Sequence, residues 1–106
     1  LRQVMLNLLL NALKAAGENG VVAARLQADE SRVRFCINNS GPVLSEDKFK
    51  STLAAESGKD PRGFGLWVCQ ELASHLRGRF ELDTTETSQT CLLFEVPNRE
   101  APEGQT

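Results

Sequence analysis

The first sixteen residues combine strong helix-forming side chains with an unusually narrow polar stripe. The segment Leu1–Ala16 (LRQVMLNLLLNALKAA) contains no glycine or proline, which predicts a continuous helix. At about 100° per residue, most of its polar side chains fall within a sector of about 80°, and the other positions are nearly all apolar. The side chains in this sector are Gln3, Asn7, Asn11 and Lys14. Asparagine is a poor interior helix former, so both amides need partners.

Two interpretations of this stripe are open. In the first, the two asparagines bond to neighbouring backbone inside the core. In the second, the stripe lines a ligand pocket, and Asn11 supplies an oxygen ligand to a hard cation such as Mg²⁺.

Periodicity in the rest of the chain predicts two strands, an irregular region, a helix and two further strands. A cap and turn are expected at Gly17–Gly20. The short link Glu30-Ser31 between the first two strands predicts an antiparallel hairpin. The expected elements are strands at Gly20–Asp29, Val33–Asn38, Arg79–Thr84 and Thr90–Val96, and a helix at Leu66–Leu76. The strand residues expected to face the core are Val33, Phe35, Ile37, Phe80, Leu82, Leu92, Phe94 and Val96.

The region from Asn39 to Arg62 has no clear periodicity. Ser45 followed by two acidic residues indicates the N-cap of a short helix. A long loop in a small domain is either an irregular connection or a functional lid over a ligand, and the sequence leaves both interpretations open.

This order of elements predicts an α+β fold. The expected architecture is a two-layer sandwich with helices on one face of a mixed, mostly antiparallel sheet. The 106 residues suit one domain with a modest core, expected over residues 1–97, followed by a polar, disordered tail over residues 98–106. Because the chain opens inside a helix, we expect it to be an N-terminally truncated fragment.

Composition and charge narrow the classes of function. With 41% hydrophobic and 25% charged residues, the chain has the composition of an ordinary soluble domain. Its net charge of −2 gives no basis for expecting nucleic-acid binding. No apolar run reaches the roughly 20 residues needed to span a bilayer. The three cysteines lack metal-ligand spacing, which predicts reduced, buried thiols in the cytosol.

A pair of glycines marks the start of the second predicted helix. Gly63-Phe64-Gly65 precedes Leu66, and glycines at a helix start let backbone N–H groups approach an anion closely. Glycines are also common at ordinary loop–helix junctions. The pattern is neither a P-loop nor a dinucleotide fingerprint. Lys14 is placed to meet either a phosphate or solvent, and His75 is expected on the surface or at the end of its helix.

Three segments together resemble the ATP-binding catalytic domain of bacterial sensor histidine kinases, whose Bergerat (GHKL) fold is shared with gyrase and the Hsp90 chaperones. These segments are NLLLNALKAA with Asn11, the turn Asn39-Ser40-Gly41-Pro42, and Gly63-Phe64-Gly65-Leu66. Leu1–Ala16 resembles the N box of the family, Gly63–Ala73 its second glycine box and helix, and Gly78–Pro97 its closing hairpin. The resemblance covers residues 1–97.

The resemblance implies a site for ATP and Mg²⁺. Asn11 would ligate the Mg²⁺ that bridges the phosphates, Asn39 would read the adenine amino group, and Leu44–Arg62 would form the lid. Asn7 stands where hydrolytic relatives carry a glutamate base, and an amide cannot accept the proton, which suits a kinase. The implied nucleotide-binding residues are Asn7, Asn11, Lys14, Asn39, Gly41, Gly63, Phe64, Gly65, Leu66 and Thr90. No catalytic residue is assigned to this chain.

The chain departs from the family pattern at two places. The family's Asp-x-Gly-x-Gly appears here as Asn39-Ser40-Gly41-Pro42-Val43, which lacks the carboxylate and the second glycine. Asn39 keeps an acceptor oxygen without the charge. The first glycine of the family's later Gly-x-Gly-x-Gly falls on Pro61.

Two functions therefore remain. The favoured one is an ATP-binding domain that donates the γ-phosphoryl group of ATP to a histidine on a separate dimerisation domain of the same protein. The alternative is a degenerate docking module that binds a response regulator or partner kinase without ATP. An anti-sigma serine kinase is disfavoured because Asn7 replaces a glutamate.

The favoured function also implies partners and a location. We expect a response regulator as partner and a cytoplasmic location. The full-length protein is expected to be a homodimer, and this fragment by itself a monomer. Attachment to a membrane-bound sensor is left open.

Overall fold

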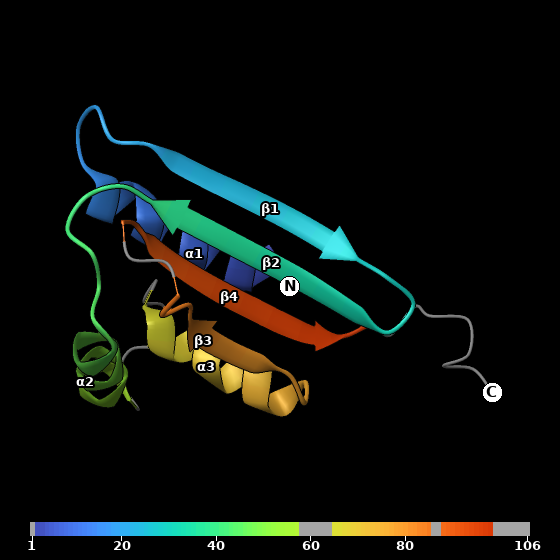
Figure 1. Ribbon diagram of the computed structural model, residues 1–106. Coiled ribbons are helices and arrows are strands. Elements are labelled where there is room, and N and C mark those ends of the chain that lie inside the picture. The colour runs from blue at the N-terminus through green and yellow to red at the C-terminus, as the bar shows by residue number, and fades with distance from the viewer. Residues whose placement is uncertain (1, 58–64, 86–87, 99–106) are drawn as a thin grey trace.

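The computed structural model describes residues 2–57, 65–85 and 88–98. Its elements are α1 (Arg2–Ala16), β1 (Val22–Ala28), β2 (Arg32–Asn39), α2 (Glu46–Glu56), α3 (Leu66–His75), β3 (Arg79–Leu82) and β4 (Thr90–Pro97). The strands form a sheet in the order β1-β2-β4-β3, and every described pairing is antiparallel. The helices lie on one side of this sheet (Figure 1), which confirms the predicted α+β sandwich.

Local capping explains where the helices begin and end. The N–H of Gly17, in a left-handed conformation with φ of 73°, donates to the Leu13 carbonyl and closes α1 as predicted. Ser45 caps α2 by accepting the Lys48 N–H at 3.1 Å. The helix begun by this cap continues to Glu56, so more of the expected lid is helical than the short predicted helix implied. Residues 58–64 of the expected lid lie outside the described residues.

Two strands end earlier than predicted, because an aspartate follows each of them and forms a turn. The Asp29 carboxylate accepts the N–H groups of Ser31 (2.7 Å) and Arg32 (2.8 Å), and this turn ends β1 at Ala28. These hydrogen bonds hold the pKa of Asp29 below its usual range. Asp83 similarly accepts the Thr85 N–H at 2.9 Å, and β3 ends at Leu82.

The core lies between the sheet and the helices. An aromatic row links α2 to the sheet, with ring centroids 5.5 Å apart for Phe49 and Phe80 and 6.5 Å apart for Phe80 and Phe94. Most of the predicted inward-facing residues are buried, although Val33 and Leu82 are only half-buried. The buried hydrophobic cluster comprises Val4, Leu8, Ala12, Phe35, Ile37, Phe49, Leu66, Cys69, Ala73, Phe80, Leu92, Phe94 and Val96.

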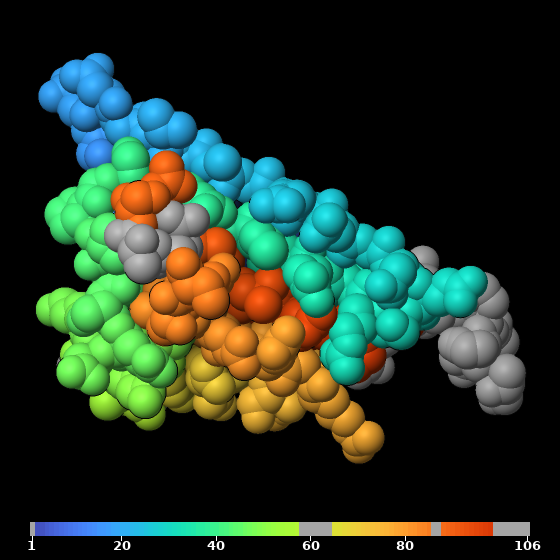
Figure 2. Space-filling model, in the orientation of Figure 1, coloured from blue at the N-terminus to red at the C-terminus, as the bar shows by residue number. Residues whose placement is uncertain are grey.

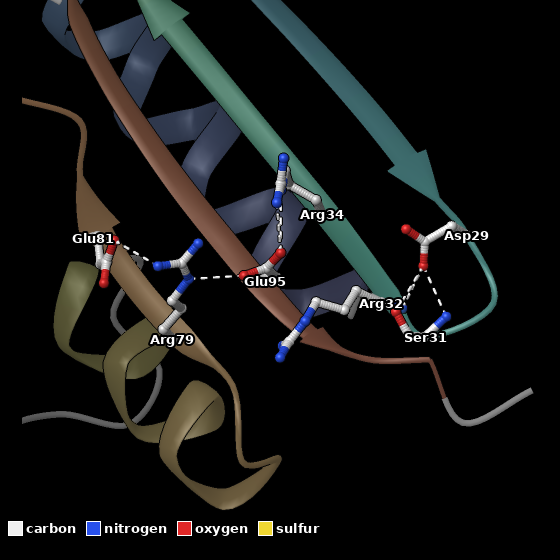
Figure 3. Close-up of polar contacts among 7 residues, drawn as sticks. All are labelled: Asp29, Ser31, Arg32, Arg34, Arg79, Glu81 and Glu95. Carbon is white, nitrogen blue, oxygen red and sulfur yellow. Dashed lines mark hydrogen bonds and ion pairs between the residues drawn. The ribbon is translucent and has the colours of Figure 1, made fainter. Parts of the chain in front are cut away.

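None of the helices that the structure describes covers the opposite face of the sheet. Figure 2 shows this face, with β4 between β2 and β3. The register places Arg34 and Arg79 on either side of Glu95, and both guanidinium groups bond its carboxylate (Figure 3), at 2.8 and 2.7 Å. The Glu95 side chain is consequently only 3% exposed. Its pKa lies below the usual range, chiefly because Arg34 donates hydrogen bonds to the charged form.

Part of the exposed apolar surface lies on α1. The outward side of α1 carries partly exposed leucines, Leu6 and Leu13 most of all. None of the helices in the described part has the length and apolar character of a bilayer-spanning segment. No disulfide joins the three cysteines, all of which lie in the described part of the chain, and Cys69 and Cys91 are buried as predicted, whereas Cys36 is half-buried. In the expected tail, the Asn98 amide donates to the Asp29 carbonyl at 2.6 Å, and residues 99–106 lie outside the described residues.

Replacing Phe49 should detach α2, because Phe49 is the buried residue of that helix. We expect Phe49→Ala to lower the free energy of unfolding by about 3–5 kcal/mol, whereas Phe49→Leu should cost roughly 1 kcal/mol. Urea denaturation followed by circular dichroism measures both. Equal losses for the two variants would contradict the packing role of the ring.

Replacing Glu95 should produce a pH-dependent loss of stability. The lowered pKa means that the charged carboxylate stabilises the fold above its ordinary pKa of 4.5, and that this stabilisation disappears as the pH falls through the lower folded-state value. Because the two arginines are half-exposed, we expect Glu95→Gln to cost only about 1–2 kcal/mol at pH 7. The difference in stability between wild type and Glu95→Gln should disappear at pH values below the ordinary pKa.

Thermal unfolding between pH 3 and pH 8 measures this difference. Glu81→Gln is the matched control, since the Glu81 side chain is 51% exposed and its carboxylate is paired with Arg79 on the same strand. A gap between wild type and Glu95→Gln that stayed constant across this range would refute the assignment.

Candidate nucleotide-binding site

Five elements converge on a cavity of about 490 Å³ at the end of the sheet where β2 ends and β4 begins. The sheet register pairs Asn39 directly with Thr90, although the two are far apart in sequence. The cavity has a largely apolar wall with a few polar groups, which is typical of small-molecule sites. Its lining residues are Asn11, Ala15, Asn39, Pro42, Val43, Leu44, Ser45, Lys48, Thr52, Leu66 and Thr90.

Thr90 fastens the loop that forms one wall of this cavity. Its Oγ1 atom accepts the Leu44 N–H at 2.8 Å and donates to the Pro42 carbonyl at 3.4 Å. Asn39 is 3% exposed, and its amide nitrogen donates to the Ser40 carbonyl at 2.8 Å. This bond leaves the amide oxygen as the side-chain atom of Asn39 that can accept a hydrogen bond from a ligand.

Gly41 lets the same loop approach α1 closely. Its φ of 104° lies in a region that side chains rarely adopt, and a Cβ atom there would lie 2.6 Å from the Ala15 carbonyl oxygen. Within the described residues, the close approach at Gly41 is therefore to the backbone of α1, and it brings the loop against the end of that helix.

A second cavity of about 510 Å³ shares Asn11 with the first. It is lined by Leu10, Asn11, Lys14, Glu56 and Gly65. Asn11 thus lines both cavities and is half-buried, and its side chain has no hydrogen-bond partner among the residues that the structure describes. Its amide is available to a ligand at the boundary between the two cavities.

Asn7, one turn before Asn11, is in a different environment. It is completely buried, accepts a hydrogen bond from the Gln3 amide at 2.6 Å and donates to the Gly65 carbonyl at 3.4 Å. The two interpretations of the polar stripe therefore apply to different residues, since Asn7 is a bonded core amide and Asn11 lines the cavities. Through Gly65, Asn7 positions the start of α3.

The N-terminus of α3 faces the second cavity. Gly65 is the N-cap and offers no side-chain acceptor, and the Trp67 N–H instead donates to Glu56 Oε1 at 3.0 Å. Burial raises the pKa of the nearby Cys69 thiol to about 12, and the negative charge of Glu56 adds to this rise. A thiol with this pKa stays protonated at neutral pH, and Cys69 is a buried residue of the core.

The structure brings together most of the residues proposed from the sequence. Asn11, Asn39, Leu66 and Thr90 line the first cavity, and Asn11, Lys14 and Gly65 line the second. Asn7 and Gly41 lie behind these surfaces in the supporting contacts described above. Gly63 and Phe64 lie outside the described residues.

One face of α2 was missed by the sequence analysis. Lys48 and Thr52 line the first cavity and Glu56 lines the second. Their spacing of four residues places all three on one side of a helix. This spacing indicates a shared face only if the region after Ser45 is predicted to be a helix of three turns. The lack of periodicity there suggested a loop instead.

The donor atoms of the site suit a metal held jointly with a ligand. Among the described residues, no group of three or more His, Cys, Asp or Glu side chains is placed to hold a metal ion. An amide oxygen such as that of Asn11 fits Mg²⁺, which prefers oxygen ligands and is commonly held by one or two side chains, several waters and the phosphates of its substrate.

Sequence comparisons assign the family. The family described as histidine kinase-, DNA gyrase B-, and HSP90-like ATPase matches residues 1–100. Among curated relatives, the adaptive-response sensory kinase SasA of Gloeothece citriformis is 31% identical over 92% of this chain. The sensor histidine kinase ZraS of Klebsiella oxytoca is 26% identical over the same share. The chain spans about a quarter of each relative, 26% and 22% respectively.

Solved structures agree with this assignment. The nucleotide-free catalytic domain of the histidine kinase ThkA is 28% identical, with a TM-score of 0.74 over 91% of this chain and 63% of that one. ThkA in complex with the response regulator TrrA matches 91% of this chain and 28% of the other, with a TM-score of 0.68 and 27% identity. This chain therefore belongs to the histidine kinase-, DNA gyrase B- and HSP90-like ATPase family, and its fold is that of the catalytic domains of sensor histidine kinases.

Proposed function

We propose that this chain is the ATP-binding catalytic domain of a sensor histidine kinase. The observation that carries the proposal is the position of Asn11, which lines both cavities and whose amide is not bonded to other described residues. An adenosine group in one cavity and a metal-bridged phosphate chain in the other would both lie beside this side chain.

The cavity at the end of the sheet suits the adenine base. Its wall includes apolar side chains from α1, the loop after β2, and α3, such as Ala15, Leu44 and Leu66. The amide oxygen of Asn39 would accept a hydrogen bond from the adenine amino group. An amide offers this acceptor without a negative charge, so the contact is weaker than one made by a carboxylate.

The second cavity suits the phosphates. Lys14 supplies a positive charge, the N-terminus of α3 supplies backbone N–H donors, and Asn11 would hold Mg²⁺. When bound, Mg²⁺ would neutralise charge on the phosphates. The residues of this chain would bind and orient the nucleotide.

The proposed reaction is transfer of the γ-phosphoryl group to a histidine on a separate dimerisation domain of the same protein. Positioning and charge neutralisation contribute most of the catalysis in phosphoryl transfer, and the chain would form no covalent intermediate. Asn7, buried and bonded to Gln3 and Gly65, has no basic atom to activate water, so hydrolysis would be slow. A response regulator is the expected downstream partner.

Nucleotide binding is the direct test of this function. Titration calorimetry with a non-hydrolysable ATP analogue and Mg²⁺ should show saturable binding, and Asn11→Ala should weaken it at least about tenfold. In EDTA the two proteins should bind equally, because Asn11 acts through the metal. Unfolding of Asn11→Ala would instead indicate a core role for this amide.

If the wild-type protein showed no binding up to millimolar nucleotide, the proposed function would be overturned. The alternative, a docking module that binds its partner without ATP, would then be favoured.

A charge introduced at Asn39 should strengthen the adenine contact. We expect Asn39→Asp to bind the ATP analogue about fivefold more tightly, since a charged acceptor adds roughly 1 kcal/mol to a hydrogen bond. The same variant should be less stable without ligand, because the carboxylate is buried and cannot donate to the Ser40 carbonyl.

Asn38→Asp is the matched control, since Asn38 is the neighbouring residue of β2 and faces the opposite side of the sheet. A large loss of affinity in Asn39→Asp would contradict the assigned contact.

A further inference from the structure

The Glu56 carboxylate lies at the N-terminus of α3. Glu56 is the last residue of α2, and its Oε1 atom accepts the N–H of Trp67, the second residue of α3, at 3.0 Å. A Cβ atom on Gly65 would lie 2.5 Å from the same oxygen. The carboxylate therefore lies directly over the residue that caps α3.

This position is one that a phosphate would also occupy. The first N–H groups of a helix have no partner within the helix, and its N-terminus carries a partial positive charge, so it attracts anions. Gly65 supplies no acceptor of its own. Glu56 thus provides, from another helix, the negative charge and the acceptor that a phosphate would provide in a nucleotide complex.

The charges around the second cavity determine how the Glu56 contact would affect phosphate binding. Lys14 and Asn11 line the same cavity and would favour a phosphate chain, whereas Glu56 would repel it. Glu56 does not line the cavity assigned to adenine. Its effect should therefore fall on the phosphates and leave the adenosine group almost unaffected.

We propose that Glu56 competes with nucleotide phosphates for the N-terminus of α3 and so lowers the affinity for triphosphates relative to adenosine. Phosphate binding displaces the carboxylate and releases the end of α2 from α3. That the competing phosphates belong to a nucleotide rests on the proposed function. The competition itself requires only an anion that bears phosphate groups.

The first experiment compares wild type with Glu56→Gln, which removes the charge and keeps an oxygen able to accept the Trp67 N–H. Calorimetry should show about tenfold tighter binding of the Mg²⁺ complex of a non-hydrolysable ATP analogue, and unchanged binding of adenosine. Glu71→Gln is the matched control, because it removes the same charge from an exposed position on α3.

Three outcomes of this comparison would overturn the inference. They are an unchanged affinity for the analogue in Glu56→Gln, an equal gain for adenosine and the analogue, and an equal gain in Glu71→Gln. The second would mean that Glu56 only positions α3, and the third that only the net charge of the domain matters.

A second experiment separates this inference from the proposed function. Inorganic tripolyphosphate should raise the thermal midpoint of Glu56→Gln more than that of wild type, and Glu56→Ala should behave as Glu56→Gln does, despite a lower midpoint without ligand. If neither the ATP analogue nor adenosine binds to any of these proteins, the proposed function fails, and this measurement still decides the inference. Equal stabilisation of wild type and both variants would overturn it.

Discussion

The antiparallel register between β2 and β4 is the constraint on which the rest of this structure depends. One alignment pairs Phe35 with Phe94 on the covered face and Arg34 with Glu95 on the open face. It also pairs Asn39 with Thr90 at the end where the cavity forms. A shift of one residue would exchange the two faces of a strand, so it would expose the core residues and bury the charged ones. Core, charge compensation and ligand cavity therefore rely on the same set of backbone hydrogen bonds.

The site itself depends on how closely the segments at this end of the sheet approach one another. Gly41 lets the loop after β2 lie against the backbone of α1, and Thr90 ties the same loop to β4. On the other side, Asn7 holds the start of α3 through the Gly65 carbonyl. These contacts use small or uncharged groups whose bonds are made within the protein. They leave Asn11, one turn after Asn7, as the amide that lines both cavities.

The charges near the site are unevenly distributed, and this affects how strongly it can bind an anion. Lys14 on α1 lines the cavity assigned to the phosphates and favours them, whereas Lys48 on α2 lines the cavity assigned to adenine. Glu56, the last residue of α2, is bonded to the N-terminus of α3, where an anion would bind. The Trp67 N–H at the N-terminus of α3 thus has an acceptor within the protein. A bound nucleotide would have to exchange these internal contacts for its own.

Much of the fold could be predicted from periodicity and capping residues, because an element's type depends on side chains close in sequence. The helix up to Ala16, the cap at Ser45 and the inward strand residues such as Phe94 follow from such local signals. The different fates of Asn7 and Asn11 do not, since both lie on one helix stripe and only packing against α3 buries the first. The role of Glu56 was equally hidden, because it depends on where the end of α2 meets another helix. Only contacts between residues distant in sequence distinguish a ligand-facing polar group from a structural one, and a one-dimensional pattern does not contain them.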